Sequence, residues 1–176
     1  HWDTLKYYLE LLSPDCLSDL RKKMVTSLIR GKQFYSNRLL GKYWRVILDG
    51  TGVACFEERH CDNCLYEKRT YKDGRKVTVY YHKVLEAKLI LGDKIVVSLG
   101  TEFIENERSD VSKQDCETKA AKRLLERIKK EYPRLPICIQ GDAMYATEPM
   151  MEICRLNGWK YIFSHKEAQQ RVLADN

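Results

Sequence analysis

The clearest hydrophobic pattern in the chain is a strict alternation between Val77 and Leu91. Apolar side chains occupy the odd positions of this stretch, with Lys83 as the one exception. A period of two predicts a β-strand with one side on a hydrophobic core. Gly92-Asp93 supplies a tight turn, so "KIVVSLGTEFI" (94–104) is predicted to return as the antiparallel partner strand.

Three short apolar runs predict further strands, this time of the buried kind. They are "YWRVILDG" (43–50), "ICIQGD" (137–142) and "KYIFS" (160–164). These runs are too short for helices, and they are rich in β-branched and aromatic residues. Between the first run and the alternating strand, residues 50–75 have no clear period, and they are predicted to form an irregular insertion.

The hydrophobic period changes to that of a helix in two segments after residue 110. In "SKQDCETKAAKRLLERIKKEYPRLP" (112–136), one helix face carries Cys116, Ala120, Leu124 and Ile128. Charged residues surround that face, which predicts a solvated outer surface that includes Asp115, Glu117 and Glu126. The second segment, "ATEPMMEICRLNGW" (146–159), predicts a helix with Thr147 at its N-cap and Gly158 past its end.

The N-terminal part of the chain also predicts a helix, from Ser13 as N-cap to Gly31 as the stop. The residues at helical spacing that predict its apolar face are Leu17, Leu20, Met24 and Leu28. The basic residues assigned to its exposed parts are Arg21, Lys22, Lys23 and Arg30.

The order of the predicted elements is strand, insertion, antiparallel hairpin, helix, strand, helix, strand. Such an order predicts an α/β fold with a mixed sheet and helices on its faces. It matches the ribonuclease H-like fold (order β-β-β-α-β-α-β), in which the first and fourth strands lie side by side and parallel. We therefore divide the chain into a basic helical segment, 1–42, and a core, 43–176.

Charge divides the chain in the same way. The net charge is +6, and residues 1–45 carry nine Lys/Arg against four Asp/Glu, which leaves only +1 for the remainder. A basic segment beside a near-neutral domain is compatible with binding to nucleic-acid phosphates. A solvated helix face explains the same bias equally well.

Composition places the protein among cytoplasmic globular proteins. The sequence is 44% hydrophobic and 32% charged, and it contains neither an apolar run long enough to cross a membrane nor a signal peptide. The odd number of cysteines argues against a disulfide framework. Cys116, Cys138 and Cys154 stand in apolar runs, which predicts buried, hydrophobic thiols.

Cys61 and Cys64 form a C-x-x-C pair, the spacing of half a structural Zn²⁺ site. Cys55, His60 and His82 are available as further ligands, but no second C-x-x-C exists. A reduced pair in a polar loop is the simpler alternative. His82 itself falls on the polar face of its strand, where it is predicted to be a surface histidine or to reach an acidic site and contact a phosphate.

Two predicted strands each end in one aspartate, Asp49 and Asp142. Asp beside Gly is ordinary turn chemistry, and this explains both residues without any function. The alternative is that the two carboxylates meet in space. Phosphoryl transfer with two metal ions needs carboxylates at such a place, and oxygen ligands suit Mg²⁺.

The segments "LDGTG" and "GDAMYATEP" resemble the first and second acidic motifs of bacterial insertion-sequence transposases of the DDE type. The region between them is similar as well, so the resemblance runs from about residue 44 to about residue 166. It implies a ribonuclease H-like core that hydrolyses a phosphodiester and joins the new end to target DNA. Asp49 and Asp142 would hold Mg²⁺ or Mn²⁺. The implied partners are element ends and target DNA, with a homodimer as one assembly and a nucleoid-associated, cytoplasmic location.

The resemblance also implies a third acid, usually Glu, on a helix after the last core strand. Glu167 is the candidate, whereas Glu148 and Glu152 stand on the helix directly after Asp142, which is the wrong element. The expectation is therefore a partial core, truncated before the family's third acid. Two alternatives stay open: a non-catalytic DNA-binding remnant of a transposase, and a ribonuclease H-like nuclease.

Overall fold

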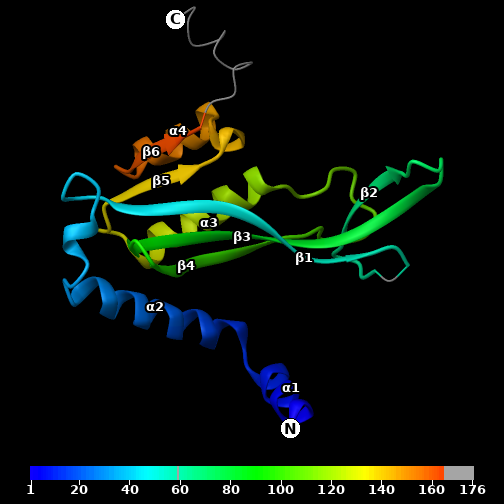
Figure 1. The fold of residues 1–176 in the computed structure, drawn as a ribbon, viewed down its shortest axis with the longest axis horizontal. Helices are drawn as coiled ribbons and strands as arrows, with labels where there is room; N and C mark the ends of the chain where they lie inside the picture. The colour runs from blue at the N-terminus through cyan, green and yellow to red at the C-terminus, as the bar shows by residue number, and fades with distance from the viewer. Residues whose placement is uncertain (59, 165–176) are drawn as a thin grey trace, which may run out of the picture.

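The computed structural model describes residues 1–58 and 60–164 (Figure 1). Its helices are α1 (Trp2–Leu11), α2 (Pro14–Arg30), α3 (Glu117–Glu131) and α4 (Glu148–Leu156), with short 3-10 turns η1 (Tyr35–Asn37) and η2 (Ala143–Tyr145). Its strands are β1 (Trp44–Phe56), β2 (Leu65–Thr70), β3 (Lys76–Gly92), β4 (Ile95–Ile104), β5 (Ile137–Gly141) and β6 (Lys160–Phe163).

The strands form one mixed sheet of six, in the order β2-β3-β1-β5-β6, with β4 pairing to β3. β1 is antiparallel to β3 and parallel to β5, and β5 is parallel to β6. The predicted α/β class with a mixed sheet is therefore confirmed. The predicted hairpin of two long strands is confirmed as well, as β3 and β4.

One edge of β3 serves two partners in succession. Residues 76–81 of β3 pair with β2, and residues 83–92 pair with β4, so His82 is where the partner changes. The other edge of β3 pairs with β1 from Tyr80 to Ile90. As a result, β1, β2 and β3 continue as a long ribbon beyond the part of the sheet that the helices cover (Figure 1).

The irregular insertion predicted for residues 50–75 is wrong over about half of its length. β1 runs for 13 residues to Phe56 instead of ending at Gly50, and β2 follows at Leu65. Most residues of these two segments are exposed. Because most side chains of these two segments meet water, they carry little hydrophobic period, although Leu65 at the start of β2 is buried and the backbone still pairs as a sheet.

The core lies between the sheet and α3. On β3 the odd positions Leu85, Ala87, Leu89 and Leu91 are fully buried, as the alternation predicts. α3 contributes the predicted face through Ala120, Leu124 and Ile128, each at most 1% exposed. The thiols of Cys138 and Cys154 are buried as predicted, but Cys116 is exposed because it stands at the N-cap, outside the helix.

α2 has the predicted bounds but not the predicted face. Ser13 caps it by accepting a hydrogen bond from the Asp15 backbone N–H at 3.2 Å. The predicted apolar residues Leu17, Leu20 and Met24 are about half exposed or more. Val25 is buried instead, and the side chains of Leu28 and Ile29 pack against the core.

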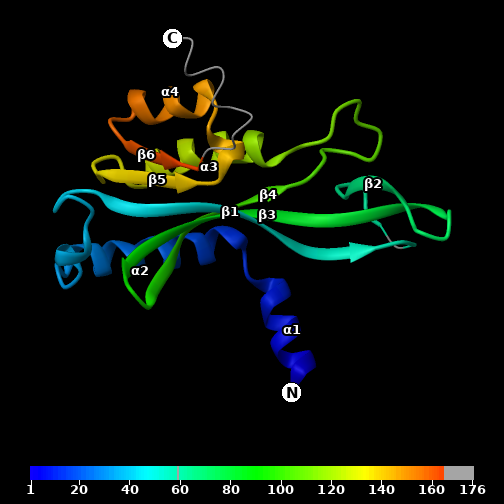
Figure 2. The same cartoon turned by 45° about the horizontal axis from the view of Figure 1, so that its top comes forward.

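Arg21 was predicted to be exposed, but its guanidinium contacts α3 and β4. It pairs with the Glu131 carboxylate at 3.1 Å and donates to the Leu99 carbonyl. The face of α2 that packs on the rest of the protein is thus partly polar, and the spacing of hydrophobic residues does not predict such a contact. α1 has no buried residue and projects away from the sheet in both ribbon views (Figures 1 and 2). None of the described helices is long and apolar enough to cross a membrane.

Candidate functional site

Asp49 and Asp142 lie at matching positions on neighbouring parallel strands. The last residue pair between β1 and β5 is Ile47 with Gln140, and each aspartate stands two residues beyond it. Neighbouring strands are about 4.8 Å apart. Both aspartates are exposed. The predicted adjacency of the first strand and the "ICIQGD" strand is confirmed, and it brings the two carboxylates to one region of the sheet.

Turn chemistry explains one of these aspartates and not the other. The Asp142 carboxylate accepts a hydrogen bond from the Met144 backbone N–H at 2.9 Å and so caps η2. Asp49 lies in the middle of β1, where it pairs with Glu86 of β3, and makes no turn. The assumption that both residues end a strand is therefore wrong for Asp49. Its exposed carboxylate has no capping role.

Tyr145 and Glu117 lie beside the two aspartates. The Tyr145 hydroxyl donates a hydrogen bond to the Glu117 carboxylate at 3.1 Å, and Lys83 forms an ion pair with the same carboxylate. Burial raises the pKa of Tyr145 far above its ordinary value, and the negative charges of Glu117, Asp142 and Asp49 raise it further. The tyrosine therefore stays protonated and acts as a hydrogen-bond donor at this site.

Glu117 was assigned to the solvated face of its helix, and this assignment is wrong. Its side chain is only 14% exposed, and its carboxylate lies against Gly50. A Cβ atom at position 50 would lie 2.5–2.7 Å from the carboxyl atoms of Glu117, so a side chain there would have to displace the end of the Glu117 side chain. Two sequence features hinted at it: the Gly after Asp49, and Lys83 as the single break in an apolar face.

The chemistry of Asp49 and Asp142 fits a hard divalent cation such as Mg²⁺. This ion commonly takes one or two protein carboxylates and fills its other positions with water and substrate phosphates. Glu117 is already bound to Lys83 and Tyr145. Glu148 and Glu152 are bound to Arg155, and Glu167 lies outside the described residues.

A second group of metal-binding side chains lies on the ribbon. Within the part of the chain that the structure describes, Cys61, Cys64 and His82 are the only three His, Cys, Asp or Glu side chains whose ligand atoms all lie close together. The two Sγ atoms are 3.6 Å apart, and the Nε2 atom of His82 is 3.4 Å from Cys61 and 3.3 Å from Cys64.

His82 was predicted to be a surface or rim histidine, and it is partly exposed. It was alternatively predicted to approach the acidic site, but its contacts lie elsewhere. Its ring faces the two thiols, at the point where β3 changes partner. The other two candidate ligands do not join the group. The His60 ring stacks on Tyr80 with centroids 4.2 Å apart. Cys55 is an exposed residue of β1.

A cleft of about 970 Å³ contains neither group. It lies between the 105–113 loop and α3. Some of its charged side chains already bind one another: Arg123 pairs with Asp115 at 2.7 Å and with Glu102 at 2.7 Å. A shallower hollow on α2, of about 480 Å³, is lined by the basic side chains of Lys22, Lys23 and Arg30.

Comparison of the chain with protein-family models, with curated proteins and with solved structures gave no match.

Proposed function

We propose that the chain is a metal-dependent polynucleotidyl transferase: the catalytic core of a DNA transposase, with Asp49 and Asp142 as its magnesium ligands. The observation that carries this proposal is the parallel pairing of β1 with β5, in a register that puts the two aspartates at equivalent positions. One of them, Asp49, is an exposed acid within a strand and has no capping role.

The strand order supports a ribonuclease H-like core as the scaffold. Without the ribbon strand β2, the sheet has the order β4-β3-β1-β5-β6, with β3 antiparallel to both β4 and β1. Its two crossovers, through α3 and α4, lead into the parallel strands β5 and β6. The parallel neighbours β1 and β5 are the part of this arrangement that was expected from the sequence.

Two side chains at this site would bind the cation, and others would hold them in position. Asp49 and Asp142 would bind the cation, which when bound stabilises negative charge on phosphate oxygens and activates a nucleophile. The Asp142 carboxylate is fixed by the Met144 N–H, so its direction is set before any ligand arrives. Tyr145 and Lys83 hold Glu117 against β1, which keeps the strand in place beneath Asp49.

Basic side chains of α2 would hold the DNA backbone. Lys22, Lys23 and Arg30 line one hollow on the helix surface, together with polar Thr26 and Ser27 and one acid, Asp19. Contacts to phosphates are independent of sequence, and they weaken steeply with salt because bound counterions are released. Glu167 is the proposed third acid, and the division of the chain at residue 42 stays a prediction.

The test is calorimetric titration of Mn²⁺ into the wild type, Asp142→Asn and Asp49→Asn, together with DNA nicking by the same proteins. Asp142→Asn keeps a side-chain oxygen that can accept from Met144, so it removes the charge without removing the cap. Glu148→Gln is the matched control, because it removes an exposed carboxylate from the helix that follows. We expect Asp142→Asn and Asp49→Asn to lose Mn²⁺ binding and Glu148→Gln to keep it.

Equal Mn²⁺ affinity in all four proteins would contradict the metal assignment. Binding that depends on both aspartates, without nicking of DNA, would instead favour a non-catalytic remnant. Nicking without joining of a 3′ end to target DNA would favour a nuclease.

A further inference from the structure

We propose that Cys61, Cys64 and His82 bind one Zn²⁺ ion, and that this ion fixes the ribbon formed by β1, β2 and β3. The site is separate from the proposed magnesium site. His82 stands four residues from Glu86, the partner of Asp49, which is about 13 Å along β3. The inference does not depend on the proposed function.

The distances between the three ligand atoms are close to the edges of one face of a tetrahedral zinc site. With Zn–S near 2.3 Å and Zn–N near 2.0–2.1 Å, tetrahedral angles give edges of about 3.8 Å between sulfurs and about 3.6 Å between sulfur and nitrogen. The observed separations are 3.6 Å between the sulfurs and 3.4 and 3.3 Å to Nε2. A small outward adjustment admits the ion, and a water molecule fills the fourth position.

The loop that carries the thiols is held in place by the protein itself. The Cys64 N–H donates to the Cys61 carbonyl at 3.2 Å, and the Cys61 N–H donates to the Cys64 Sγ at 3.3 Å. These bonds close the C-x-x-C turn, and one of them aims the Cys61 N–H at the Cys64 sulfur. Hydrogen bonds to metal ligands orient them and tune their binding.

Asn106 fixes the same loop from the far side. It is the only buried polar or charged residue in the described chain, at 2% exposure. Its side-chain amide donates to the Cys64 carbonyl at 2.9 Å, and its backbone N–H donates to the Asn63 carbonyl at 3.0 Å. The Asn63 side chain donates back to the Asn106 carbonyl at 2.8 Å. The turn is therefore pre-organised for a ligand.

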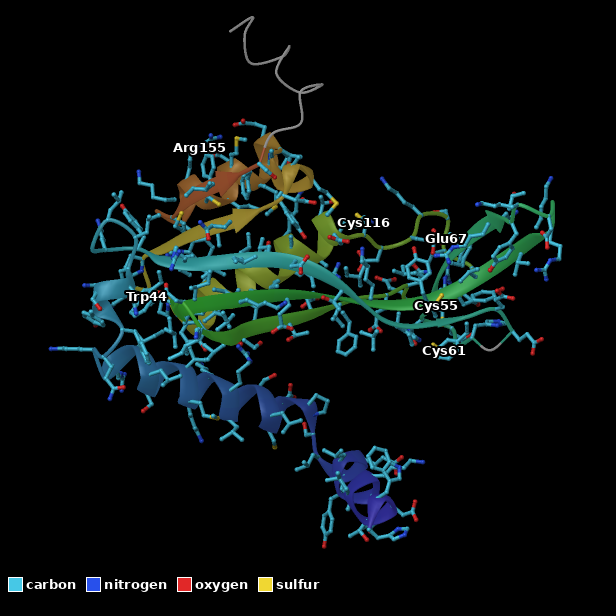
Figure 3. All side chains as sticks on the ribbon, in the orientation of Figure 1. Trp44, Cys55, Cys61, Glu67, Cys116 and Arg155 are labelled. Carbon is cyan, nitrogen blue, oxygen red and sulfur yellow. The ribbon has the colours of Figure 1, made fainter. Side chains whose placement is uncertain are left out.

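The position of the site indicates what the ion would do. Cys61 and Cys64 precede β2, and His82 is the β3 residue just beyond the β2 pairing. Figure 3 places Cys61 on the ribbon, well away from the covered part of the sheet where Trp44 lies. Two-stranded sheet segments are marginal in water, and the ribbon has little core to stabilise it. A metal that joins the loop to β3 compensates for that missing core.

The rival chemistry for these side chains is a Cys61–Cys64 disulfide. Bond formation would need an oxidant and would bring the sulfurs from 3.6 Å to about 2.05 Å. It would leave His82 without a role, although its ring nitrogen faces both sulfurs. The zinc site uses all three side chains.

The experiment is metal analysis of the full chain purified under reducing conditions, followed by Co²⁺ titration of the metal-free protein. We expect one Zn²⁺ per chain and a thiolate-to-cobalt charge-transfer band. His82→Gln and Cys64→Ser should each weaken binding by at least about 100-fold, since loss of a residue that only hydrogen-bonds to a metal ligand already costs about 10–100-fold. Cys55→Ser is the matched control and should bind like the wild type.

Because Cys64 is buried, Cys64→Ser can lose metal through misfolding, whereas His82 is partly exposed and its substitution is the safer test. Hydrogen exchange adds a second measurement: zinc should slow exchange at residues 53–82 and leave β5 and α3 unchanged. The proposal is overturned if the reduced wild type binds no zinc, if His82→Gln binds like the wild type, or if Cys55→Ser loses binding to the same extent as His82→Gln.

Discussion

Replacing Gly50 with alanine tests whether Glu117 lies on β1. The added Cβ would collide with the Glu117 carboxyl group at 2.5–2.7 Å and push it away from Lys83 and Tyr145. Hydrogen bonds to a charged group contribute about 1.5–3 kcal/mol. The Lys83 side chain is 32% exposed, so screening by solvent puts its share at the lower end.

A gain opposes this loss. Alanine is more favourable than glycine inside a strand by about 0.5–1 kcal/mol, and Gly50 has no positive φ that alanine would strain. The expected net effect is a free energy of unfolding lowered by about 1–2 kcal/mol, which corresponds to a Tm about 3–6 °C lower for a chain of this size. Urea denaturation and calorimetry both measure it.

The sign of the effect is the decisive result. A Glu117→Ala background removes the three atoms nearest to the added Cβ, so Gly50→Ala should stabilise by about 0.5–1 kcal/mol there. Gly52→Ala is the matched control in the same strand, since a Cβ there meets nothing within 4 Å, and it should stabilise in both backgrounds. If Gly50→Ala stabilises the wild type as much as Gly52→Ala does, Glu117 does not lie against β1.

Three further predictions concern the rest of the molecule. Burial raises the pKa of the Cys154 thiol to about 11. The folded state therefore favours the neutral thiol, and this contribution to stability is complete below the unfolded pKa, near 8.5. It is lost as the pH rises from there to 11. The wild type should lose about 3 kcal/mol more than Cys154→Ala over that range in urea denaturation, and parallel profiles would refute this. Asn106→Ala leaves the Cys64 carbonyl and the Asp115 N–H without their partner, so the free energy of unfolding should fall by about 2–4 kcal/mol. A fall below about 0.5 kcal/mol, the size of an ordinary surface substitution, would contradict these hydrogen bonds. Arg21→Met should speed hydrogen exchange throughout α2, whereas the exposed Lys23→Met should not, and equal rates in the two variants would mean that Arg21 does not dock the helix.

The core strands and helices could be predicted because their side chains face two different environments. Their hydrophobic positions indicate which face is buried in the core, as in the alternation from Val77 to Leu91 and on the α3 face with Ala120, Leu124 and Ile128. The ribbon could not be found in this way, because most side chains of β2 and of the end of β1 are exposed, with only Leu65 of β2 buried among them. Backbone pairing without burial leaves little trace in the hydrophobic pattern.

The candidate sites were predictable where element order or motif spacing sets them, and not where they depend on strand register or a tertiary contact. The parallel neighbours β1 and β5 follow from element order, so Asp49 and Asp142 could be paired from the sequence. The C-x-x-C spacing identified Cys61 and Cys64, but His82 joins them only through the register of β2 and β3. Glu117 depends on a contact between an α3 terminus and a glycine in β1, which no spacing rule contains.

The change of partner at His82 affects how the chain can vary in length. Residues 83–92 of β3 keep their register through β4, whatever happens to the part that pairs with β2. The turn at 71–75, closed by a bond from the Tyr71 N–H to the Arg75 carbonyl at 2.9 Å, is exposed. A peptide tag or a short domain inserted there would lengthen the ribbon without shifting the core strands. The hairpin of β2 and β3 around the 71–75 turn is thus a suitable place to attach a probe. It is also a segment that related chains could lengthen or shorten freely.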